Sequence, residues 1–101
     1  MTIAEILRQI SGRTTDAGGY VASYTVREGQ NVVACVDASL DNSSRTVTDW
    51  RVKWTAHYRD GAEIKSETST NLTKLLARFG AVDLTPMSQT KPEEFFAKQS
   101  G

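Results

Sequence analysis

Apolar side chains recur every three or four residues near the start of the chain, as they do along one side of a helix. They are Ile3, Ile6, Leu7 and Ile10. Thr2 and Glu5 have the spacing of a capping box, in which each side chain takes a free backbone N–H of the first turn. The sequence therefore predicts an N-terminal helix within residues 1–12.

From Tyr20 the period of the pattern changes to two, which is typical of strands with one buried face. Residues 20–27 alternate in this way, and the turn-forming residues 28–31 predict a hairpin after them. The next strand, residues 32–40, is largely apolar or small on both sides, which predicts the most buried strand of the sheet.

The third strand has the sharpest alternation in the chain. One of its faces carries the apolar side chains Trp50, Val52, Trp54, Ala56 and Tyr58. The other carries the polar side chains Arg51, Lys53, Thr55, His57 and Arg59. Asp60-Gly61 predicts a tight hairpin turn. The mostly polar fourth strand, residues 62–68, is expected at an exposed edge of the sheet.

A second helical stripe follows the fourth strand and is made of Leu72, Leu75, Leu76 and Phe79. Gly80 comes directly after it, where a helix commonly ends. The segment around Leu84, Pro86 and Met87 is predicted to be a loop. Thr90 to Glu93 has the residues of another helix start, and Phe95 and Phe96 are expected to anchor this last piece.

These elements predict an α+β fold, a four-stranded antiparallel meander with a C-terminal helix packed on one face and a short N-terminal helix. We interpret residues 1–101 as a single domain. Its parts are an N-terminal helix in 1–12, an antiparallel sheet in 19–69 and a helical C-terminal part in 70–101. The aromatic face of the third strand is interpreted as the core, covered by the helix at 72–79. The alternative is an interface, in which another copy or a partner covers part of this face.

Charge balance and cysteine content disfavour several classes of protein. Twelve Lys and Arg balance twelve Asp and Glu, which disfavours binding of nucleic acid or of an anionic membrane by bulk charge. Cys35 is the only cysteine, so neither an internal disulfide nor a thiolate zinc cluster can form. We expect it to be a buried thiol. With no signal peptide and no membrane-spanning segment in the sequence, we expect a cytoplasmic protein that does not enter a membrane.

The sequence offers few groups for catalysis. His57 is the only histidine, and no Ser–His, Cys–His or phosphate-binding glycine motif accompanies it. We interpret it as a surface histidine between basic residues, or else as a hydrogen-bonding group on a binding surface. We expect no catalytic residues, no cofactor and no metal. An enzyme that uses carboxylates at an unassigned site remains an alternative.

The polar side of the third strand is the candidate binding face. It consists of Arg51, Lys53, His57 and Arg59, joined by Lys65 if the register allows it. Alternate residues of a strand are about 6.6 Å apart, and such a row can follow the phosphates of a single nucleic-acid strand. The aromatic rings that stack on bases in such proteins are predicted on the opposite face, which weighs against this function.

The order of four strands followed by a helix resembles single-strand-binding transcription-cofactor domains. A small neutral chain without a catalytic set is also similar to accessory proteins of phages and mobile elements, including inhibitors that occupy a partner's surface. We interpret the protein as a non-enzymatic binding or regulatory protein that acts by protein–protein contact and forms a homo-oligomer. Single-stranded nucleic-acid binding and carboxylate-based catalysis are the alternatives.

Overall fold

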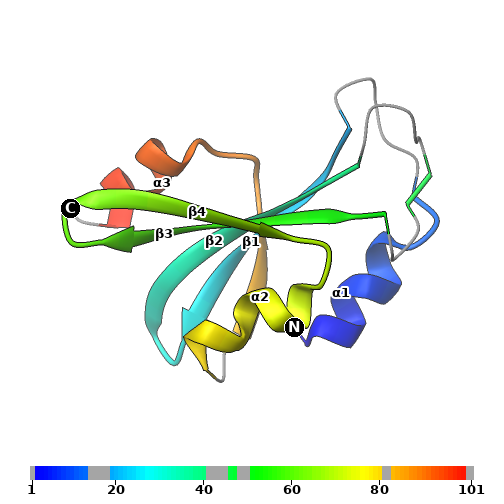
Figure 1. Ribbon diagram of the computed structural model, residues 1–101, viewed down its shortest axis with the longest axis horizontal. Helices are drawn as coiled ribbons and strands as arrows, with labels where there is room; N and C mark the ends of the chain where they lie inside the picture. The colour runs from blue at the N-terminus through cyan, green and yellow to red at the C-terminus, as the bar shows by residue number, and fades with distance from the viewer. Residues whose placement is uncertain (1, 14–18, 41–45, 48–50, 81–82, 100–101) are drawn as a thin grey trace.

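The computed structural model describes residues 2–13, 19–40, 46–47, 51–80 and 83–99. Its elements are α1 (Ile3–Ile10), β1 (Tyr20–Glu28), β2 (Asn31–Ser39), β3 (Lys53–Asp60), β4 (Glu63–Ser69), α2 (Leu72–Leu76), the 3-10 turn η1 (Ala77–Phe79), β5 (Asp83–Met87) and α3 (Pro92–Gln99) (Figure 1). The fold is α+β with an antiparallel sheet, as the sequence predicted.

The described sheet has five strands in the order β4-β3-β2-β1-β5, and every neighbouring pair is antiparallel. The first four strands form the predicted meander, but the prediction of four strands was wrong. Residues 83–87, expected as a loop, pair with β1, so that Thr85 lies opposite Thr25. The edge of β1 supplies the backbone partners for this short segment, which contains Pro86 and has little strand propensity of its own.

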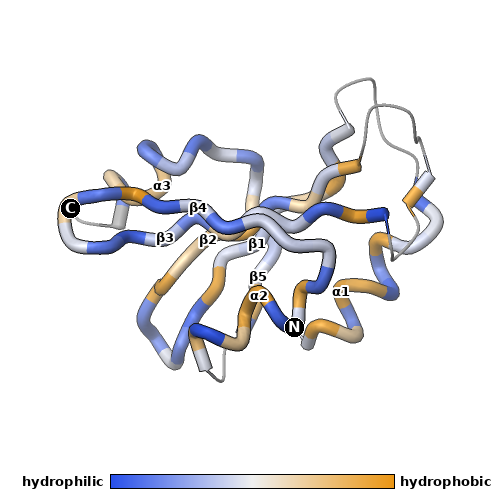
Figure 2. Tube along the Cα trace, in the orientation of Figure 1, coloured by the Kyte–Doolittle hydropathy of each residue, from blue (hydrophilic) through white to orange (hydrophobic). Residues whose placement is uncertain are grey.

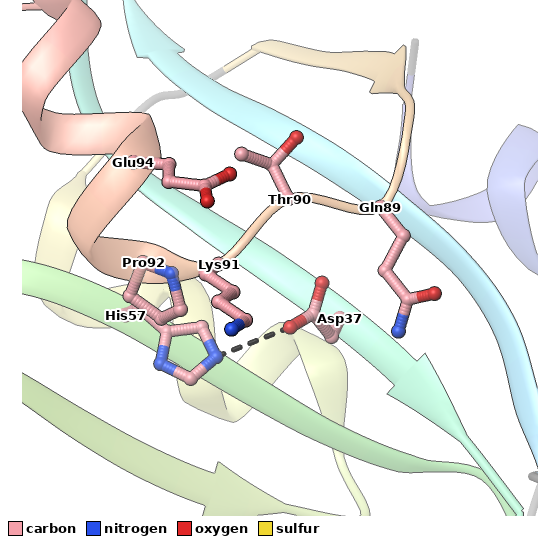
Figure 3. A pocket seen from close by; sticks show the side chains of 7 residues that line it. All are labelled: Asp37, His57, Gln89, Thr90, Lys91, Pro92 and Glu94. Carbon is pink, nitrogen blue, oxygen red and sulfur yellow. Dashed lines mark hydrogen bonds and ion pairs between the residues drawn. The ribbon is translucent and has the colours of Figure 1, made fainter.

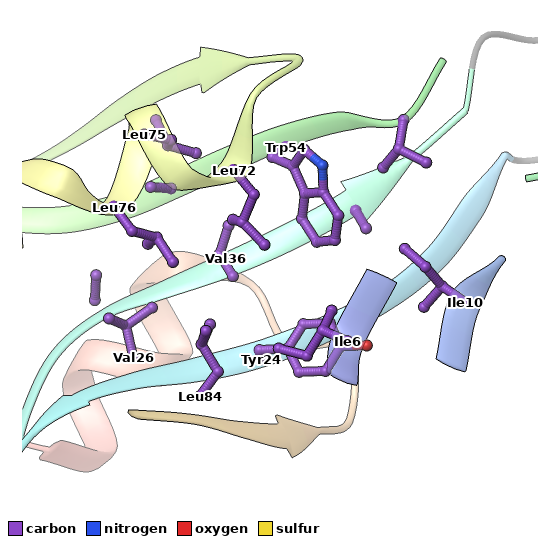
Figure 4. Close-up of a cluster of buried hydrophobic side chains, with 14 of the residues drawn as sticks. Ile6, Ile10, Tyr24, Val26, Val36, Trp54, Leu72, Leu75, Leu76 and Leu84 are labelled. Carbon is purple, nitrogen blue, oxygen red and sulfur yellow. The ribbon is translucent and has the colours of Figure 1, made fainter. Parts of the chain in front are cut away.

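Two helices cover one face of the sheet and the third lies on the other face, as Figure 1 shows. The core fills the space between the sheet and the helices α1 and α2 (Figure 4). Its members include Ile6, Ile10, Tyr24, Val26, Val36, Trp54, Leu72, Leu75, Leu76 and Leu84. The side chain of Trp54 is buried within it, as predicted for the aromatic face. Trp50, predicted on the same face, lies outside the described residues.

The helix α3 closes one end of the opposite face. Phe95 and Phe96 are buried there, with ring centroids 5.0 Å apart in an edge-to-face arrangement. Together with Cys35 they form a second, smaller apolar cluster, against which Ile64 and Met87 pack. The rest of this face is polar, and the segment that leads from β5 into α3 is largely hydrophilic (Figure 2). The sheet is therefore apolar on both sides at one end only.

No helix in the described part of the chain has the length and apolar character needed to cross a membrane.

Candidate functional site

Side chains from four strands form one hydrogen-bonded network on the face that α3 partly covers. The hydroxyl of Tyr20 donates to Ser23 Oγ at 3.0 Å, and Ser23 Oγ donates to Asp37 Oδ1 at 2.6 Å. The other oxygen, Asp37 Oδ2, lies 3.2 Å from His57 Nε2. His57 Nδ1 lies 2.7 Å from Ser66 Oγ. The network thus crosses β1, β2, β3 and β4 in order.

Strand register explains why these residues meet. Ser23 lies directly opposite Asp37, and His57 directly opposite Ser66. Asp37 lies opposite Thr55, which puts His57 in the diagonal position of the same face, within reach of a long side chain. Each pair is local to two strands, but the complete network needs all four strands in this order.

The electrostatic environment of Asp37 favours its ionised form. Burial raises the pKa of this carboxyl. Hydrogen bonds from His57 and Ser23, together with the electrostatic attraction of His57, lower the pKa by more than burial raises it, so the pKa lies below its ordinary value. An ionised carboxylate only accepts hydrogen bonds, so His57 Nε2 carries the hydrogen in this contact. In the neutral imidazole, Nδ1 then accepts from the hydroxyl of Ser66. Asp37 therefore orients the ring.

The lowered pKa of Asp37 predicts a dependence of stability on pH. Over the acidic window the unfolded chain binds more protons than the folded chain, so the free energy of unfolding rises with pH there. The contribution is fully present above the unfolded-state pKa of about 3.9 and is lost as pH falls through the folded-state value. Urea unfolding between about pH 2 and pH 6 measures it.

Asp37→Asn should reduce this slope, because an amide does not titrate. Asp83→Asn, the same change at an exposed position, is the control and should leave most of the slope in place. A slope that is unchanged in Asp37→Asn would contradict the role of this carboxylate.

A pocket of about 520 Å³ opens beside the network, where the segment between β5 and α3 passes over the sheet (Figure 3). It is lined by Asp37, His57, Gln89, Thr90, Lys91, Pro92 and Glu94. Figure 3 shows the side chains of Gln89 and Lys91 directed toward the Asp37–His57 pair. The lining contains carboxylates, an ammonium group, an amide and a hydroxyl, which suits a polar ligand group more than an apolar one.

The structure divides the predicted basic row. Lys53 and His57 share the polar face with Arg59, whose guanidinium lies 5.5 Å from the centre of the Phe96 ring. Arg51 precedes β3 and is exposed. Lys65 is on the opposite face of the sheet.

The position of Lys65 follows from the register of the β3–β4 hairpin. Lys65 pairs with Tyr58, whose side chain belongs to the core side. Its ammonium group lies 2.7 Å from Asp60. The polar face and Lys65 are therefore separate features of the molecule.

His57 differs from the simpler expectation of a surface histidine. Only 14% of its side chain is exposed, and its hydrogen-bond partners are the carboxylate of Asp37 and the hydroxyl of Ser66. The sequence did contain one signal for this, since Asp37 is the only charged residue in the otherwise apolar or small strand β2. A charge in such a strand requires a partner. Ser66 carried no comparable signal.

The order Ser66–His57–Asp37 is that of a hydroxyl, an imidazole and a carboxylate in nucleophilic hydrolases. Sequence reasoning missed it because the three residues come from three strands. Here the carboxylate also accepts from Ser23, and the imidazole lies mostly covered on the sheet. The same hydrogen bonds also fix the orientation of these side chains, so the geometry is compatible with recognition as well as with chemistry.

Cys35 is buried as predicted and lies under α3. Burial, with a smaller contribution from the charge of Asp37, raises the pKa of its thiol to about 12. The thiol therefore stays protonated at neutral pH and does not supply a nucleophile.

Comparison of the chain with models of protein families gave no match, and comparisons with curated proteins and with solved structures gave none either. The functional proposal therefore depends on the site itself.

Proposed function

We propose that this protein is a non-enzymatic binding or regulatory protein that contacts a partner protein through its polar face. We define the polar face as the side of the sheet that carries Ser23, Asp37, Lys53, Thr55, His57, Arg59, Ser66 and Thr68. Ser23 is buried beneath this face, whereas 31% of the Asp37 side chain is exposed. The observation that supports the proposal is the hydrogen-bonded network beside an open pocket. Side chains that are already ordered lose little conformational entropy when a partner binds.

The chemistry of the pocket indicates which group of the partner it accepts. Asp37 already accepts bonds from Ser23 and His57, but a carboxylate has about four acceptor sites. Glu94 adds a second carboxylate to the rim. We therefore propose that a side chain rich in hydrogen-bond donors, such as an arginine on a loop of the partner, enters this pocket.

The nucleic-acid alternative has less support than the protein-contact proposal. Arg59 packs on Phe96 and Lys65 belongs to the other face, which leaves Arg51 and Lys53 as the principal phosphate contacts of the predicted row. Two such residues neutralise few phosphates, so the affinity for nucleic acid would be low and would depend only weakly on salt concentration.

A photo-crosslinking residue placed at Gln89 or at Gln9 tests the proposal in an extract of the source cells. Both glutamines are exposed, but Gln89 lines the pocket and Gln9 lies on α1. We expect a protein crosslinked from position 89 that is absent from position 9. Affinity of the purified partner should then fall at least about tenfold in Glu94→Ala, the size of a moderate hot spot. The neighbouring exposed Glu93→Ala should leave it unchanged.

Equal crosslinking from both positions, or equal effects of the two glutamate variants, would contradict the proposal. Hydrolysis of an activated ester that Ser66→Ala abolishes would favour an enzyme instead. Salt-sensitive binding of single-stranded oligonucleotides that Lys53→Glu abolishes would favour the nucleic-acid alternative.

A further inference from the structure

Within the described part of the chain, one edge of the strand β4 has no neighbouring strand. Among the described strands it is bonded to β3 alone, and its seven residues continue without a bulge from Glu63 to Ser69. The other edge strand, β5, is shorter and carries Pro86. Unpaired N–H and C=O groups on a regular edge form a template for another strand, whereas proline blocks one.

Hairpin geometry identifies the backbone groups that face outward. The β3–β4 turn has two residues, Gly61 and Ala62, between the closing pair Asp60–Glu63. The closing pair of such a hairpin exchanges its backbone hydrogen bonds, and hydrogen-bonded pairs then alternate along the ladder. Every second residue of β4 therefore directs its N–H and C=O away from β3. These residues are Ile64, Ser66 and Thr68.

Close contacts between side chains agree with this assignment. Opposed residues that exchange no backbone hydrogen bond have their side chains closer together. Ser66 Oγ lies 2.7 Å from the imidazole of His57, its opposite residue. Thr68 Oγ1 lies 3.2 Å from Thr55 Oγ1, again directly opposite.

We propose that β4 pairs with β4 of a second copy of this chain, antiparallel and centred on Ser66. In this register all seven residues of the two strands overlap. Lys65 of each copy lies opposite Glu67 of the other, because positions equally distant from the centre pair in an antiparallel two-fold arrangement. The result is one continuous sheet across the dimer, with two opposite-charge pairs on one face.

Repulsion between like charges disfavours the two registers that are centred one residue to either side of Ser66. A centre on Lys65 would place two lysines opposite each other and Glu63 opposite Glu67. A centre on Glu67 would oppose two glutamates. Like charges in directly opposed positions destabilise a sheet, so the register centred on Ser66 is the one that combines full overlap with complementary charge.

The charged side chains involved are exposed and already belong to small ion pairs. Lys65 bonds to Asp60, and Glu67 bonds to Arg78. In the dimer these pairs join across the interface. On the polar face the hydroxyls of Ser66 from both copies become neighbours, which links the two hydrogen-bonded networks.

Sedimentation equilibrium of the full-length chain with Lys65→Glu or Glu67→Lys tests the proposal. Each substitution makes both cross-dimer pairs repulsive, and we expect dissociation at least about tenfold more favourable than in the natural protein. An equimolar mixture of the two variants should recover dimers, because an acidic pair in one chain then faces a basic pair in the other. Lys74→Glu, the same charge change as Lys65→Glu at an exposed position of α2, is the control.

A second pair of variants addresses the backbone. Ser66→Pro removes an outward N–H without removing a backbone hydrogen bond to β3. It also loses the hydroxyl that contacts His57, and Ser66→Ala loses only that hydroxyl. We expect the proline variant alone to be monomeric, with circular dichroism like that of the alanine variant. A monomeric natural protein at hundreds of micromolar, or variants whose mixture dimerises no better than each alone, would overturn the proposal. The outcomes for the charge variants are independent of the pocket and its partner, because Lys65 and Glu67 lie on the other face of the sheet.

Discussion

Trp54→Ala is expected to lower the free energy of unfolding by about 3–5 kcal/mol. Trp54 is 1% exposed and lies on β3 within the main apolar cluster. Removal of the indole leaves a cavity that the surrounding sheet and helices fill only in part. A domain of this size has a total stability of about 5–15 kcal/mol, so this single substitution removes a large share of the total.

Urea unfolding followed by far-ultraviolet circular dichroism measures the loss. Thr55→Ala provides the control on the adjacent residue, whose side chain points to the polar face and contacts Thr68. It should cost about 1 kcal/mol or less. A loss in Trp54→Ala that is no larger than in Thr55→Ala would show that Trp54 does not support the core.

Gly19→Ala is expected to lower the free energy of unfolding by about 2–5 kcal/mol. Gly19 has φ +75°, and a Cβ there would lie 2.6 Å from the carbonyl oxygen of Leu40. The left-handed conformation alone costs a side chain about 1–2 kcal/mol, and the overlap with backbone adds about 1–3 kcal/mol. Because Leu40 N–H also donates to Gly19 O at 2.8 Å, neither chain segment can move away without loss of this bond.

Gly29→Ala separates the two causes. Gly29 also has positive φ, at +62°, but a Cβ there would meet no atom within 4 Å. It should cost about 1–2 kcal/mol, the conformational part alone. The same unfolding measurement compares the two variants. Equal losses would mean that the close approach of Gly19 to Leu40 is not important. Gly19 directly precedes Tyr20, the first residue of the hydrogen-bonded network. A larger loss in Gly19→Ala than in Gly29→Ala would therefore show that close packing at this end of the sheet stabilises the fold.

The sequence contained enough information to place several residues of the site. The face of Lys65 was one that sequence reasoning overlooked. A two-residue turn always places an odd-numbered position opposite an even-numbered one across the β3–β4 hairpin. Lys65 therefore could not share a face with Arg59, and the hairpin signal at Asp60-Gly61 already contained this information. The isolated charge of Asp37 in β2 similarly indicated a partner, although it did not say which one.

The sequence by itself determined the helices, the first four strands of the sheet and the two faces of β3. Period-two alternation placed Trp54 in the core and His57 on the other side, because side chains of a strand alternate whatever lies beside it. Helical spacing likewise marked the buried stripe of α2, which includes Leu72 and Leu76. These patterns depend only on neighbouring positions along the chain.

Only the tertiary structure decided which distant elements meet. It paired β5 with β1, placed α3 on the face opposite α1 and α2, and joined Asp37, His57 and Ser66 in one network. Strand order and register arise from the packing of the whole domain, because a single strand could pair with several other strands at similar free energy. The pocket that Lys91 lines exists for the same reason, since its walls come from β2, β3, the segment before α3 and the first turn of α3.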